Sequence, residues 1–485
     1  MKLDLPSPTR DLLARLPLPS PTYLAGGTIR DLLLGRRVRD IDLTVPRGAI
    51  SLAQEVAQKL NGVFVLLDET EGVARVVKGG LVLDFSDFRE GSQSIEEDLR
   101  RRDFTINAMA CEVRSLLASR ALIIDPTSGL ADLARRTIRA TSKEALKRDP
   151  LRLLRAHRLA AELSFRIEPK TLEAISCLRK TLRQVAAERV IYELNLIFET
   201  PRAARTVTEL RKDGLFEVIF PELLDGAGIE QPPFHHLDVL EHSLESLNMM
   251  EAVLKAPEKY FGRLHPAFPS GAESDRQRLL KLAALFHDVG KPKTLAYKGH
   301  RPTFYNHDRV GAELFFLWAK RWRMNLKEAE TVAHLIRLHM RPFYLLRDFK
   351  AQSLTGRAQR RLLKETGKSY PDLFLVAMAD SLASAGPAKP KDAEQTLAAL
   401  FWELDRFYHQ QVEPVIRAPR LITGDDLIVE FGLTPGPIFR RLLEAVEEAA
   451  ILGEIKDRHE ALSLVAQILR QEGLNAGWSK EAGRT

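Results

Sequence analysis

The feature that most constrains the fold of this 485-residue chain is a change of hydrophobic pattern near residue 130. Before it, residues 22–125 alternate short runs rich in β-branched residues with helical stretches, which predicts a small α/β domain. After it, apolar residues recur at three-to-four spacing almost to the end, which predicts helices. We therefore expect an α+β protein, with a small α/β head followed by a long all-α remainder.

Local signals refine this division. Five runs of the head are expected to be strands, and these are TYLAGG, DIDLTV, GVFVLL, ARVVKG and LVLDFSDF. One helix is expected to start at Thr28, whose hydroxyl is suited to capping it, and another to run through SLAQEVAQKL. The Gly- and Pro-rich LLDGAGIEQPPF predicts a boundary near residue 228, and ASAGPAKPKD predicts a linker. We expect four segments, covering residues 1–125, 126–228, 229–390 and 391–485.

Composition argues against membrane and secreted classes. No run approaches the ~18 apolar residues of a membrane-spanning helix, and MKLDLPSPTR lacks the apolar core of a secretory signal. The only cysteines, Cys111 and Cys177, cannot build a disulfide framework and fit a reducing compartment. We expect a cytoplasmic protein that has no membrane partner.

Positive charge is concentrated in one part of the chain. The net charge is +7, and residues 135–209 alone contain 17 Lys/Arg against 9 Asp/Glu, a net of +8. A localised basic surface is what contacts to nucleic-acid phosphates require. A solvated helical face would give the same count, so charge alone does not distinguish a nucleic-acid-binding surface from a solvated one.

The segment YLAGGTIRDLLLGRRVRDIDLTV is typical of a phosphate- and metal-binding site. Gly26 and Gly27 end a strand and lead into a helix, so backbone N–H groups can approach a phosphate, and Arg30 lies one turn later. Asp40 and Asp42 lie two apart on a predicted strand, so their carboxylates share a face and are suited to binding two Mg²⁺ ions. Asp84, in LVLDFSDF, is a candidate third carboxylate, with a solvated strand residue as the alternative.

Five motifs in order resemble the class II tRNA nucleotidyltransferases and the related bacterial poly(A) polymerases. After the first segment come EEDLRRRDFTINAMA, DPTSGLADLARRTIRA, RDPLRLLRAHRLAAEL and AAERVIYEL. The resemblance covers residues 22 to about 225 and implies a polymerase-β-like nucleotidyltransferase head with a helical neck. It implies that Gly27 and Arg30 contact the triphosphate and that Asp40 and Asp42 hold the metals.

The resemblance also assigns roles in the later motifs. Arg102 and Asp103 would contact the nucleotide, supported by Asn107, and Asp149 with Arg152 would read the base edge. Arg152, Arg155 and Arg158 recur every three residues and form one helical stripe, which the resemblance places at the nucleotide. Glu188 and Arg189 would brace that helix.

Two departures from the family pattern concern the choice of nucleotide. Arg148 stands where the family usually has Glu before the template Asp149. Only about REGSQSI separates the LVLDFSDF strand from the next helix, where CCA-adding relatives carry a longer loop that assists the switch to ATP. Relatives that add only the two C residues lack that loop, so a CC-adding enzyme is a serious alternative to a CCA-adding one.

A second constellation, of histidines and aspartates, lies in the segment from residue 229 to 390. It comprises His242, His287, Asp288, His307, His339 and Asp380. Imidazoles and carboxylates from several helices make a divalent-metal site that activates water. The segment FHDVGKPKT resembles an HD phosphohydrolase domain, which implies one metal (Mn, Ni, Mg or Fe) on His242, His287, Asp288 and Asp380. His307 and His339 would bind a second metal or a phosphate. His235, His236 and His334 are expected to be structural.

Together these features predict a tRNA nucleotidyltransferase that adds C residues from CTP, with ATP use left open, and releases pyrophosphate. The helical tail resembles the tRNA-binding tail of bacterial CCA-type enzymes. The alternatives are a poly(A) polymerase, and an HD phosphohydrolase whose head binds RNA. A purely structural RNA-binding protein would leave both carboxylate clusters unexplained. The oligomeric state stays open.

Overall fold

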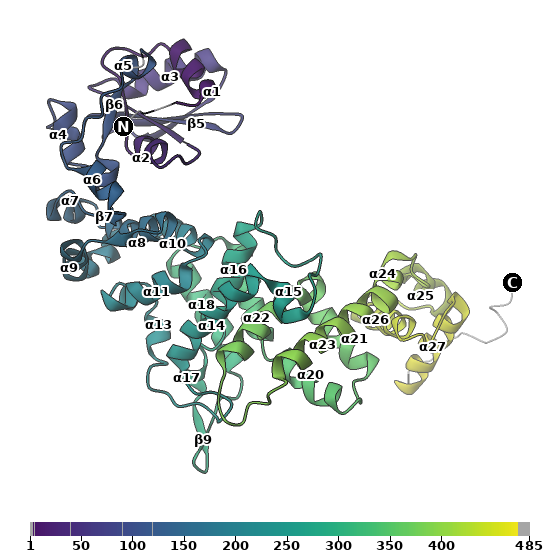
Figure 1. Cartoon of the computed structure of the whole chain (residues 1–485). Helices are drawn as coiled ribbons and strands as arrows, with labels where there is room; N and C mark the ends of the chain where they lie inside the picture. The colour runs from purple at the N-terminus through teal and green to yellow at the C-terminus, as the bar shows by residue number, and fades with distance from the viewer. Residues whose placement is uncertain (1–2, 4, 39, 90, 119, 474–485) are drawn as a thin grey trace. The chain divides into compact units, whose positions relative to one another are not determined.

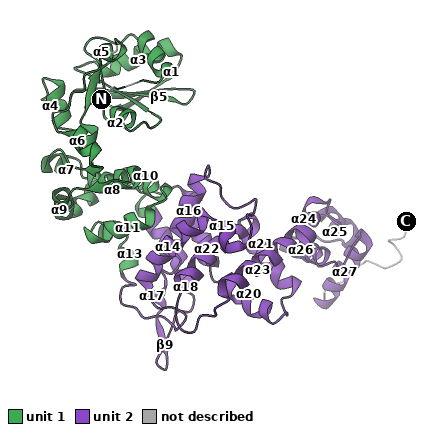
Figure 2. Ribbon diagram, in the orientation of Figure 1, with its two compact units in different colours: residues 1–224, 320–324 green, residues 225–319, 325–485 purple. Residues whose placement is uncertain are grey.

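The computed structural model describes residues 3, 5–38, 40–89, 91–118 and 120–473, which form two compact units (Figure 2). Unit 1 comprises residues 1–224 and 320–324, and unit 2 comprises residues 225–319 and 325–485. The expected α+β class is confirmed, because one six-stranded sheet lies in the head and helices dominate the remainder (Figure 1). Within the described ranges, no helix combines the length and the apolar character needed to cross a membrane.

The head is built on a sheet with the strand order β3-β4-β5-β2-β1-β6. Its strands are β1 (Tyr23–Ala25), β2 (Asp40–Val45), β3 (Val63–Asp68), β4 (Val73–Lys78), β5 (Leu81–Asp87) and β6 (Ala110–Glu112). All five expected runs are confirmed as strands, and only the three-residue β6 was not expected. The β2–β5 pair is parallel, whereas every other pair in this sheet is antiparallel.

The β2–β5 register separates a core face from a polar face. Leu43 is paired with Phe85, and both are buried. Helix α3 (Ala49–Leu60) packs on β3, β4 and β5 and supplies the buried Ala53 and Val56. Because side chains alternate along a strand, the neighbouring positions point the other way. The same register pairs Asp42 with Asp84 on that opposite face.

Helices complete unit 1. Those of the head are α1 (Ser7–Arg15), α2 (Gly27–Leu33), α4 (Ile95–Arg100), η1 (Thr105–Asn107), α5 (Val113–Leu117) and α6 (Gly129–Ala134). Those that follow are α7 (Lys143–Arg148), α8 (Leu151–Leu163), α9 (Pro169–Leu178), η2 (Arg179–Gln184), α10 (Ala187–Glu199), α11 (Ala203–Lys212), α12 (Phe216–Ile219) and α13 (Pro221–Leu224). A two-stranded sheet, β7 (Thr137–Ile138) with β8 (Arg166–Ile167), was not expected.

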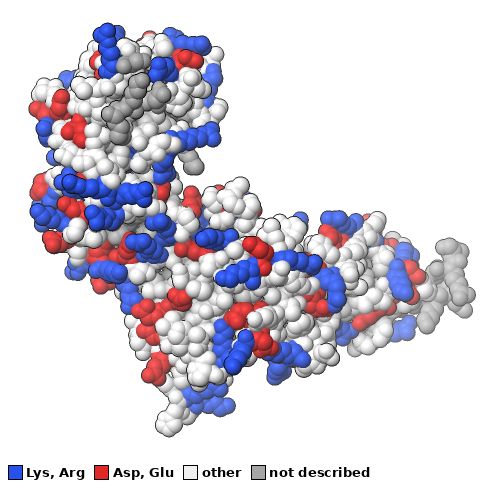
Figure 3. Space-filling view, viewed as in Figure 1, with Lys and Arg blue, Asp and Glu red and all other residues white. Residues whose placement is uncertain are grey.

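Helix α8 packs on α10 and α11 through buried residues that include Leu153 and Leu194. Lys and Arg side chains gather over this helical part in Figure 3, with acidic side chains among them.

Up to residue 473, where the described part of the chain ends, unit 2 is helical apart from one hairpin. Its first helices are α14 (Val239–Lys255), α15 (Pro257–Phe261), α16 (Ser274–Phe286), α17 (Lys291–Thr294), α18 (His307–Arg321), α19 (Leu326–Leu338), α20 (Arg341–Lys350), α21 (Gly356–Thr366), η3 (Gly367–Ser369) and α22 (Tyr370–Ala383). Then follow α23 (Ala393–Phe407), the π-helical η4 (Tyr408–Val412), α24 (Glu413–Arg417), α25 (Gly424–Phe431), α26 (Pro437–Ile451) and α27 (Arg458–Gln471). The hairpin joins β9 (Ala296–Lys298) to β10 (Arg301–Thr303) and was not expected. The C-terminal end of α18, from residue 320, belongs to unit 1.

The segment ASAGPAKPKD is not a linker between separate bodies, and this corrects the sequence-based expectation. The N–H of Gly386 donates to the carbonyl oxygen of Phe234 at 2.9 Å. A Cβ atom at Gly386 would lie 2.2 Å from the carbonyl oxygen of Pro233. The loop therefore packs tightly inside unit 2, and its Gly and Pro residues reflect close backbone contact. The chain divides at residues 224 and 225 instead, near the boundary expected at 228. The division into four segments stays a prediction.

Candidate active sites

The head and the helices after it enclose a cavity of about 570 Å³ in unit 1. Carboxylates from β2 and β5 line one part of it and arginines line another. The lining residues include Gly26, Gly27, Arg30, Asp40, Asp42, Asp84, Arg89, Arg102, Asp103, Asn107, Arg152, Arg155, Arg158 and Glu193. Of the residues predicted for nucleotidyl transfer, the cavity brings together all but Asp149. Such a distribution suits a ligand that carries phosphates and divalent ions together.

Gly26, which follows β1, allows the close approach of Arg102 and of Asp42 on β2 at this cavity. Its φ of +68° lies in the left-handed region, which favours glycine. A Cβ atom at this position would lie 3.0 Å from a guanidinium nitrogen of Arg102 and 3.1 Å from Oδ2 of Asp42. Gly27 opens helix α2 at ordinary contact distances and has no such restriction.

Asp40 and Asp42 occupy alternate positions of β2, as predicted, and both line the cavity. Burial, together with the neighbouring Asp84, raises the pKa of Asp42 to about 6, although Arg102 and Arg30 oppose this. A buried carboxylate with so high a pKa is poorly compensated by the protein alone, which fits a position that a divalent cation stabilises when it binds. These two residues could hold the metal ions.

Thr28 does not cap helix α2, which corrects the sequence-based expectation. The N-cap is Gly26, and no side chain caps the helix. The Thr28 hydroxyl instead accepts the N–H of Asp42 at 2.7 Å and donates to the carbonyl oxygen of Asp40 at 3.2 Å. The Thr28 N–H donates to Oδ2 of Asp42 at 3.3 Å. Thr28 therefore ties the start of the helix to the strand that carries both carboxylates.

Buried arginines occupy the positions next to these carboxylates. Arg30 donates to Oδ1 of Asn107 at 2.8 Å and makes a bidentate pair with Asp31. Arg102 donates to Oδ2 of Asp98 at 3.1 Å and to the hydroxyl of Thr44 at 2.9 Å. Asp98 is fully buried, so Arg102 is held rigidly in the cavity wall.

Asp103 links the head to the arginine stripe of α8. Its carboxylate accepts hydrogen bonds from the N–H of Phe104 at 2.8 Å, from Asn107 at 3.2 Å and from Arg155 at 3.4 Å. Burial acts to raise the pKa of Asp103, but the guanidinium groups of Arg155 and Arg152 outweigh it and hold this pKa at about 2. Asp103 is therefore ionised and positions Arg155 and Asn107 rather than presenting a free carboxylate.

Glu193 on α10 is a site residue that sequence reasoning missed. It is 2% exposed and accepts hydrogen bonds from Arg155 at 3.0 Å and from Arg158 at 2.6 Å. Glu193 thereby braces α8, which was the role expected of Glu188, whereas Glu188 pairs with Arg323. Five residues along a helix correspond to a rotation of about 140°, so Glu188 and Glu193 lie on different faces of α10. Glu193 belongs to the motif AAERVIYEL, and this was the sequence signal that could have identified it as a site residue.

Asp149 and Arg152 lie at the junction of α7 and α8. Asp149 accepts the N–H of Leu151 at 3.2 Å and pairs with Arg189 at 2.9 Å, so Arg189 braces this junction. Arg152 donates to the carbonyl oxygen of Ala145 at 3.0 Å. Its Nε is buried and has no hydrogen-bond partner among the described residues. Asp149 lies outside the set of residues that line the cavity, whereas Arg152 lies in it.

Asp84 lies beside the metal-binding pair but is already engaged. Arg75 on β4 makes a bidentate pair with it, at 2.7 and 2.8 Å. The carboxylate is therefore neutralised by a cation of the protein itself. Asp84 borders the cavity and is the candidate third carboxylate. Because Arg75 occupies both of its oxygens, Asp84 has fewer free lone pairs for a metal than Asp42 has.

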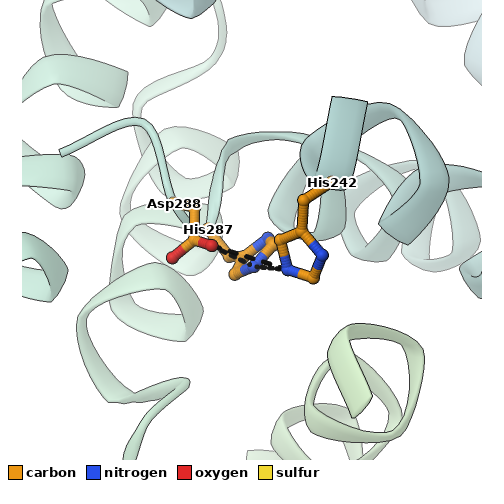
Figure 4. Close-up of side chains that lie close together, drawn as sticks. All are labelled: His242, His287 and Asp288. Atoms are coloured by element: carbon orange, nitrogen blue, oxygen red, sulfur yellow. Dashed lines mark hydrogen bonds and ion pairs between the residues drawn. The ribbon is translucent and has the colours of Figure 1, made fainter. Parts of the chain in front are cut away.

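A second site lies within unit 2, where six residues converge from five elements. His242 comes from α14, His287 and Asp288 follow α16, His307 begins α18, His339 follows α19 and Asp380 lies on α22. The His242 and His287 rings and the Asp288 carboxylate point toward one another in Figure 4. All six are buried, and the structure brings together every residue predicted for this site.

The ring nitrogens at this site fit a metal. Nδ1 of His287, His307 and His339 each lies 2.6–2.8 Å from a backbone carbonyl oxygen, so Nδ1 carries the proton. Their Nε2 atoms therefore present lone pairs, and Nε2 of His307 faces Nε2 of His339 at 3.2 Å. Nε2 of His287 faces that of His242 at 3.2 Å. The lone pairs of His307 and His339 repel at this distance unless a cation lies near them.

Asp288 divides the site into two groups. Its Oδ2 lies 3.1 Å from Nε2 of His287 and 3.5 Å from that of His242. Its Oδ1 lies 3.4 Å from Nε2 of His307 and 3.7 Å from that of His339. Each group of three is close enough to share one ion. A bridging carboxylate of this kind could hold two metals side by side.

Two further residues border this site. Lys291 pairs with Asp288 at 2.5 Å and donates to Gln231 at 2.7 Å. His235, expected to be purely structural, packs edge-on against the His242 ring, with 4.6 Å between centroids. Its Nδ1 lies 2.9 Å from the hydroxyl of Ser384, and burial lowers its pKa to about 3. No sequence signal separated His235 from the adjacent His236.

Family comparisons match successive parts of the chain. Residues 22–139 match the poly A polymerase head domain, and residues 164–226 match the probable RNA and SrmB-binding site of polymerase A. Residues 239–385 match the HD domain, and residues 394–466 match the putative domain 2 of tRNA nucleotidyltransferase.

Relatives of known activity are similar over almost the whole length. The A-adding tRNA nucleotidyltransferase of Deinococcus radiodurans is 35% identical, over 93% of this chain and 96% of the relative. The CC-adding tRNA nucleotidyltransferase of Thermus thermophilus is 33% identical, over 91% of this chain and 92% of the relative. A solved CCA-adding enzyme in its apo form shares the fold, with a TM-score of 0.63 at 23% identity over 97% of this chain and 96% of that one.

Proposed function

Because this chain belongs to the family of tRNA nucleotidyltransferases, we propose that it extends the 3′ end of tRNA with nucleotides from CTP or ATP and releases pyrophosphate. The observation that carries this proposal is the cavity of unit 1, where Asp40 and Asp42 lie opposite a set of arginines. The carboxylates suit divalent ions, and the guanidinium groups suit phosphates. A nucleoside triphosphate and its metals need both.

Asp40 and Asp42 would hold Mg²⁺, which when bound lowers the pKa of the attacking 3′-hydroxyl and neutralises charge on the phosphates. Arg30 and Arg102, held by Asn107 and Asp98, would contact the triphosphate and stabilise its charge. Because these donors are fixed before the substrate binds, they stabilise the transition state without reorganisation. The helix α2 begins at Gly27 and presents backbone N–H groups beside Asp42.

Arg152 is the candidate reader of the base. Its Nε is a buried donor with no partner in the described part of the chain, and a nucleobase acceptor would satisfy it. Asp149 is held at the start of the same helix by Arg189. Its position outside the cavity lining implies that base reading by Asp149 needs a local change in this junction.

We further propose that this chain carries out one part of CCA synthesis, adding either CC or A. Four relatives that cover more than nine tenths of this chain, at 29–35% identity, are named A-adding or CC-adding. Three relatives that are named multifunctional CCA proteins match 60–75% of it. Of the two activities, the short connection between β5, which ends at Asp87, and α4, which begins at Ile95, favours CC addition.

A product-length assay tests this proposal. tRNA without CCA and tRNA ending in CC are each incubated with CTP, with ATP and with both. We expect either two C residues on the first tRNA or one A on the second, and not both reactions. Complete CCA on the first tRNA would contradict the restriction, and long tails of A would instead identify a poly(A) polymerase.

The facing Nε2 atoms of His307 and His339 in unit 2 favour a second activity. We propose that the histidine–aspartate site binds divalent metal and hydrolyses phosphate esters. Bound metal supplies a water of lowered pKa, and Lys291 lies beside Asp288 to stabilise negative charge. Hydrolysis of p-nitrophenyl phosphate with added Mn²⁺ tests this. Asp380→Asn should abolish it and Asp42→Asn should not, whereas hydrolysis that survives Asp380→Asn would contradict the assignment.

A further inference from the structure

Unit 2 contains a cavity that neither proposed activity uses. It encloses about 560 Å³, and its lining includes Arg263, His265, Tyr370, Trp402, Tyr408 and His409. It is distinct from the histidine–aspartate site, because Tyr370 and Asp380 are ten residues apart on α22, which is about 15 Å along a helix. A second hollow, of about 530 Å³, shares Arg263, Trp402 and His409 with it. Cavities of this size accept small organic ligands.

One side of the cavity is a rigid hydrogen-bonded group. The hydroxyl of Tyr370 donates to Oδ1 of Asp405 at 2.7 Å, and Nε2 of His265 lies 2.9 Å from the same oxygen. The N–H of Ala267 donates to Nδ1 of His265 at 3.1 Å. Nδ1 is therefore unprotonated, so Nε2 carries the proton and donates it to Asp405.

This protonation pattern argues against a metal at the cavity. His265, Asp405 and His409 lie close enough together to share an ion. A metal on Nε2 of His265 would require the loss of its only ring proton, because the N–H of Ala267 already occupies the Nδ1 lone pair. Tyr370, His265 and Asp405 therefore form a rigid part of the cavity lining. Oδ1 of Asp405 accepts hydrogen bonds from the other two residues.

The rest of the cavity lining presents aromatic surface together with cations. Nε1 of Trp402 donates to the carbonyl oxygen of Phe261 at 2.7 Å, which fixes the indole, and the Arg263 guanidinium lies 3.9 Å from its ring centroid. The Tyr408 ring packs 5.5 Å from that of Tyr370. Arg263 and Lys368 are exposed where they border the cavity.

The backbone at Tyr408 is unusual in a way that points to binding. Residues Tyr408–Val412 form a π-helical turn directly after α23. Such turns are rare and frequently occur at functional sites. Here the turn begins with Tyr408 and His409, and both line the cavity. The acid that acts on Lys368 is Glu413, and it is paired with His409 at 2.6 Å and with Arg417 at 2.6 Å, so less of its charge offsets Lys368.

We propose that this cavity binds a single nucleotide through stacking of its base on the aromatic side chains and pairing of its phosphate with Arg263 and Lys368. Aromatic rings next to cations are the combination that unpaired nucleotides require, and stacking accepts any base. The nucleotide is a free mononucleotide or an unpaired residue of an RNA. The site is separate from the nucleotidyl-transfer cavity and does not depend on that assignment.

Photo-crosslinking of the full chain with 8-azido-AMP, followed by peptide mapping, tests the proposal. We expect a crosslinked peptide that contains Tyr408, reduced about 10-fold in Arg263→Ala/Lys368→Ala. Arg347→Ala, an exposed arginine of α20, is the matched control and should leave the yield unchanged. Circular dichroism establishes that the double variant folds, and Trp402→Phe provides an independent loss of stacking surface.

Competition separates the two sources of nucleotide. Stronger competition by AMP than by a single-stranded oligoribonucleotide identifies a free ligand, and the reverse order identifies RNA. Crosslinks confined to peptides of the unit 1 cavity would overturn the proposal. So would a Tyr408 crosslink that is unaffected in both the double variant and Trp402→Phe.

Discussion

At the scale of single residues, Gly26 shows how backbone conformation shapes the nucleotidyl-transfer cavity. Its φ of +68° opposes any larger residue, and so do the tight contacts that a methyl group there would make with Arg102 and Asp42. We expect Gly26→Ala to lower the free energy of unfolding by about 1–2 kcal/mol. Gly27→Ala is the matched control, since its contacts are ordinary. Equal losses in urea unfolding of the two variants would contradict this account.

Asp103 makes a pH-dependent contribution to stability. Its pKa in the folded chain is about 2, below the ordinary 3.8, so it stabilises the fold above the ordinary pKa. That contribution is lost as pH falls toward 2 and amounts to about 2 kcal/mol. We expect the difference in unfolding free energy between the native chain and Asp103→Asn to shrink over that range. A difference independent of pH would contradict the pairing with Arg155.

Sequence reasoning found most of the site residues but not their partners. Asp40, Asp42 and the α8 arginines follow from spacing, because strand and helix periods fix which side chains share a face. Glu193 and His235 were missed, since their roles depend on which neighbour each meets in space. Arg75, which neutralises Asp84, likewise became visible only through the register of β4 and β5.

At the scale of elements, the α8–α10 pair controls how the arginines are presented. Glu193 holds both Arg155 and Arg158 through a buried carboxylate. We expect Glu193→Gln to raise the KM for the nucleotide about 3- to 10-fold with little change in kcat, because ground-state and transition-state contacts weaken together. Glu173→Gln, on the exposed face of α9, is the control. A fall in kcat at unchanged KM would argue against a positioning role.

The expected elements were those with strong local signals. The strands β1–β5 are β-branched runs ended by Gly or Asp, and the helices show clear apolar periodicity. The elements missed were short: β6 has three residues, and the β9–β10 hairpin is largely exposed. The ASAGPAKPKD segment was misjudged because Gly and Pro mark close packing as well as flexibility.

At the scale of the whole molecule, each unit contains its own candidate active site. The histidine–aspartate site joins α14, α16, α18, α19 and α22, so a bound metal crosslinks the core of unit 2. We expect Mn²⁺ at about 1,000 times its Kd to stabilise this unit by about 4 kcal/mol. Calorimetry should show that shift in the native chain and not in Asp288→Asn. An equal shift in both would place the metal elsewhere.

We propose that Asp40 and Asp42 hold the metal ions for nucleotide transfer to RNA in unit 1. Incorporation of labelled CTP or ATP into tRNA lacking its 3′ end, with the native chain and with Asp42→Asn, tests it most directly. We expect incorporation to fall by about 1,000-fold or more in the variant, while hydrolysis at the unit 2 site is unchanged. Incorporation by Asp42→Asn at the native rate would contradict the assignment of this cavity as the transferase site.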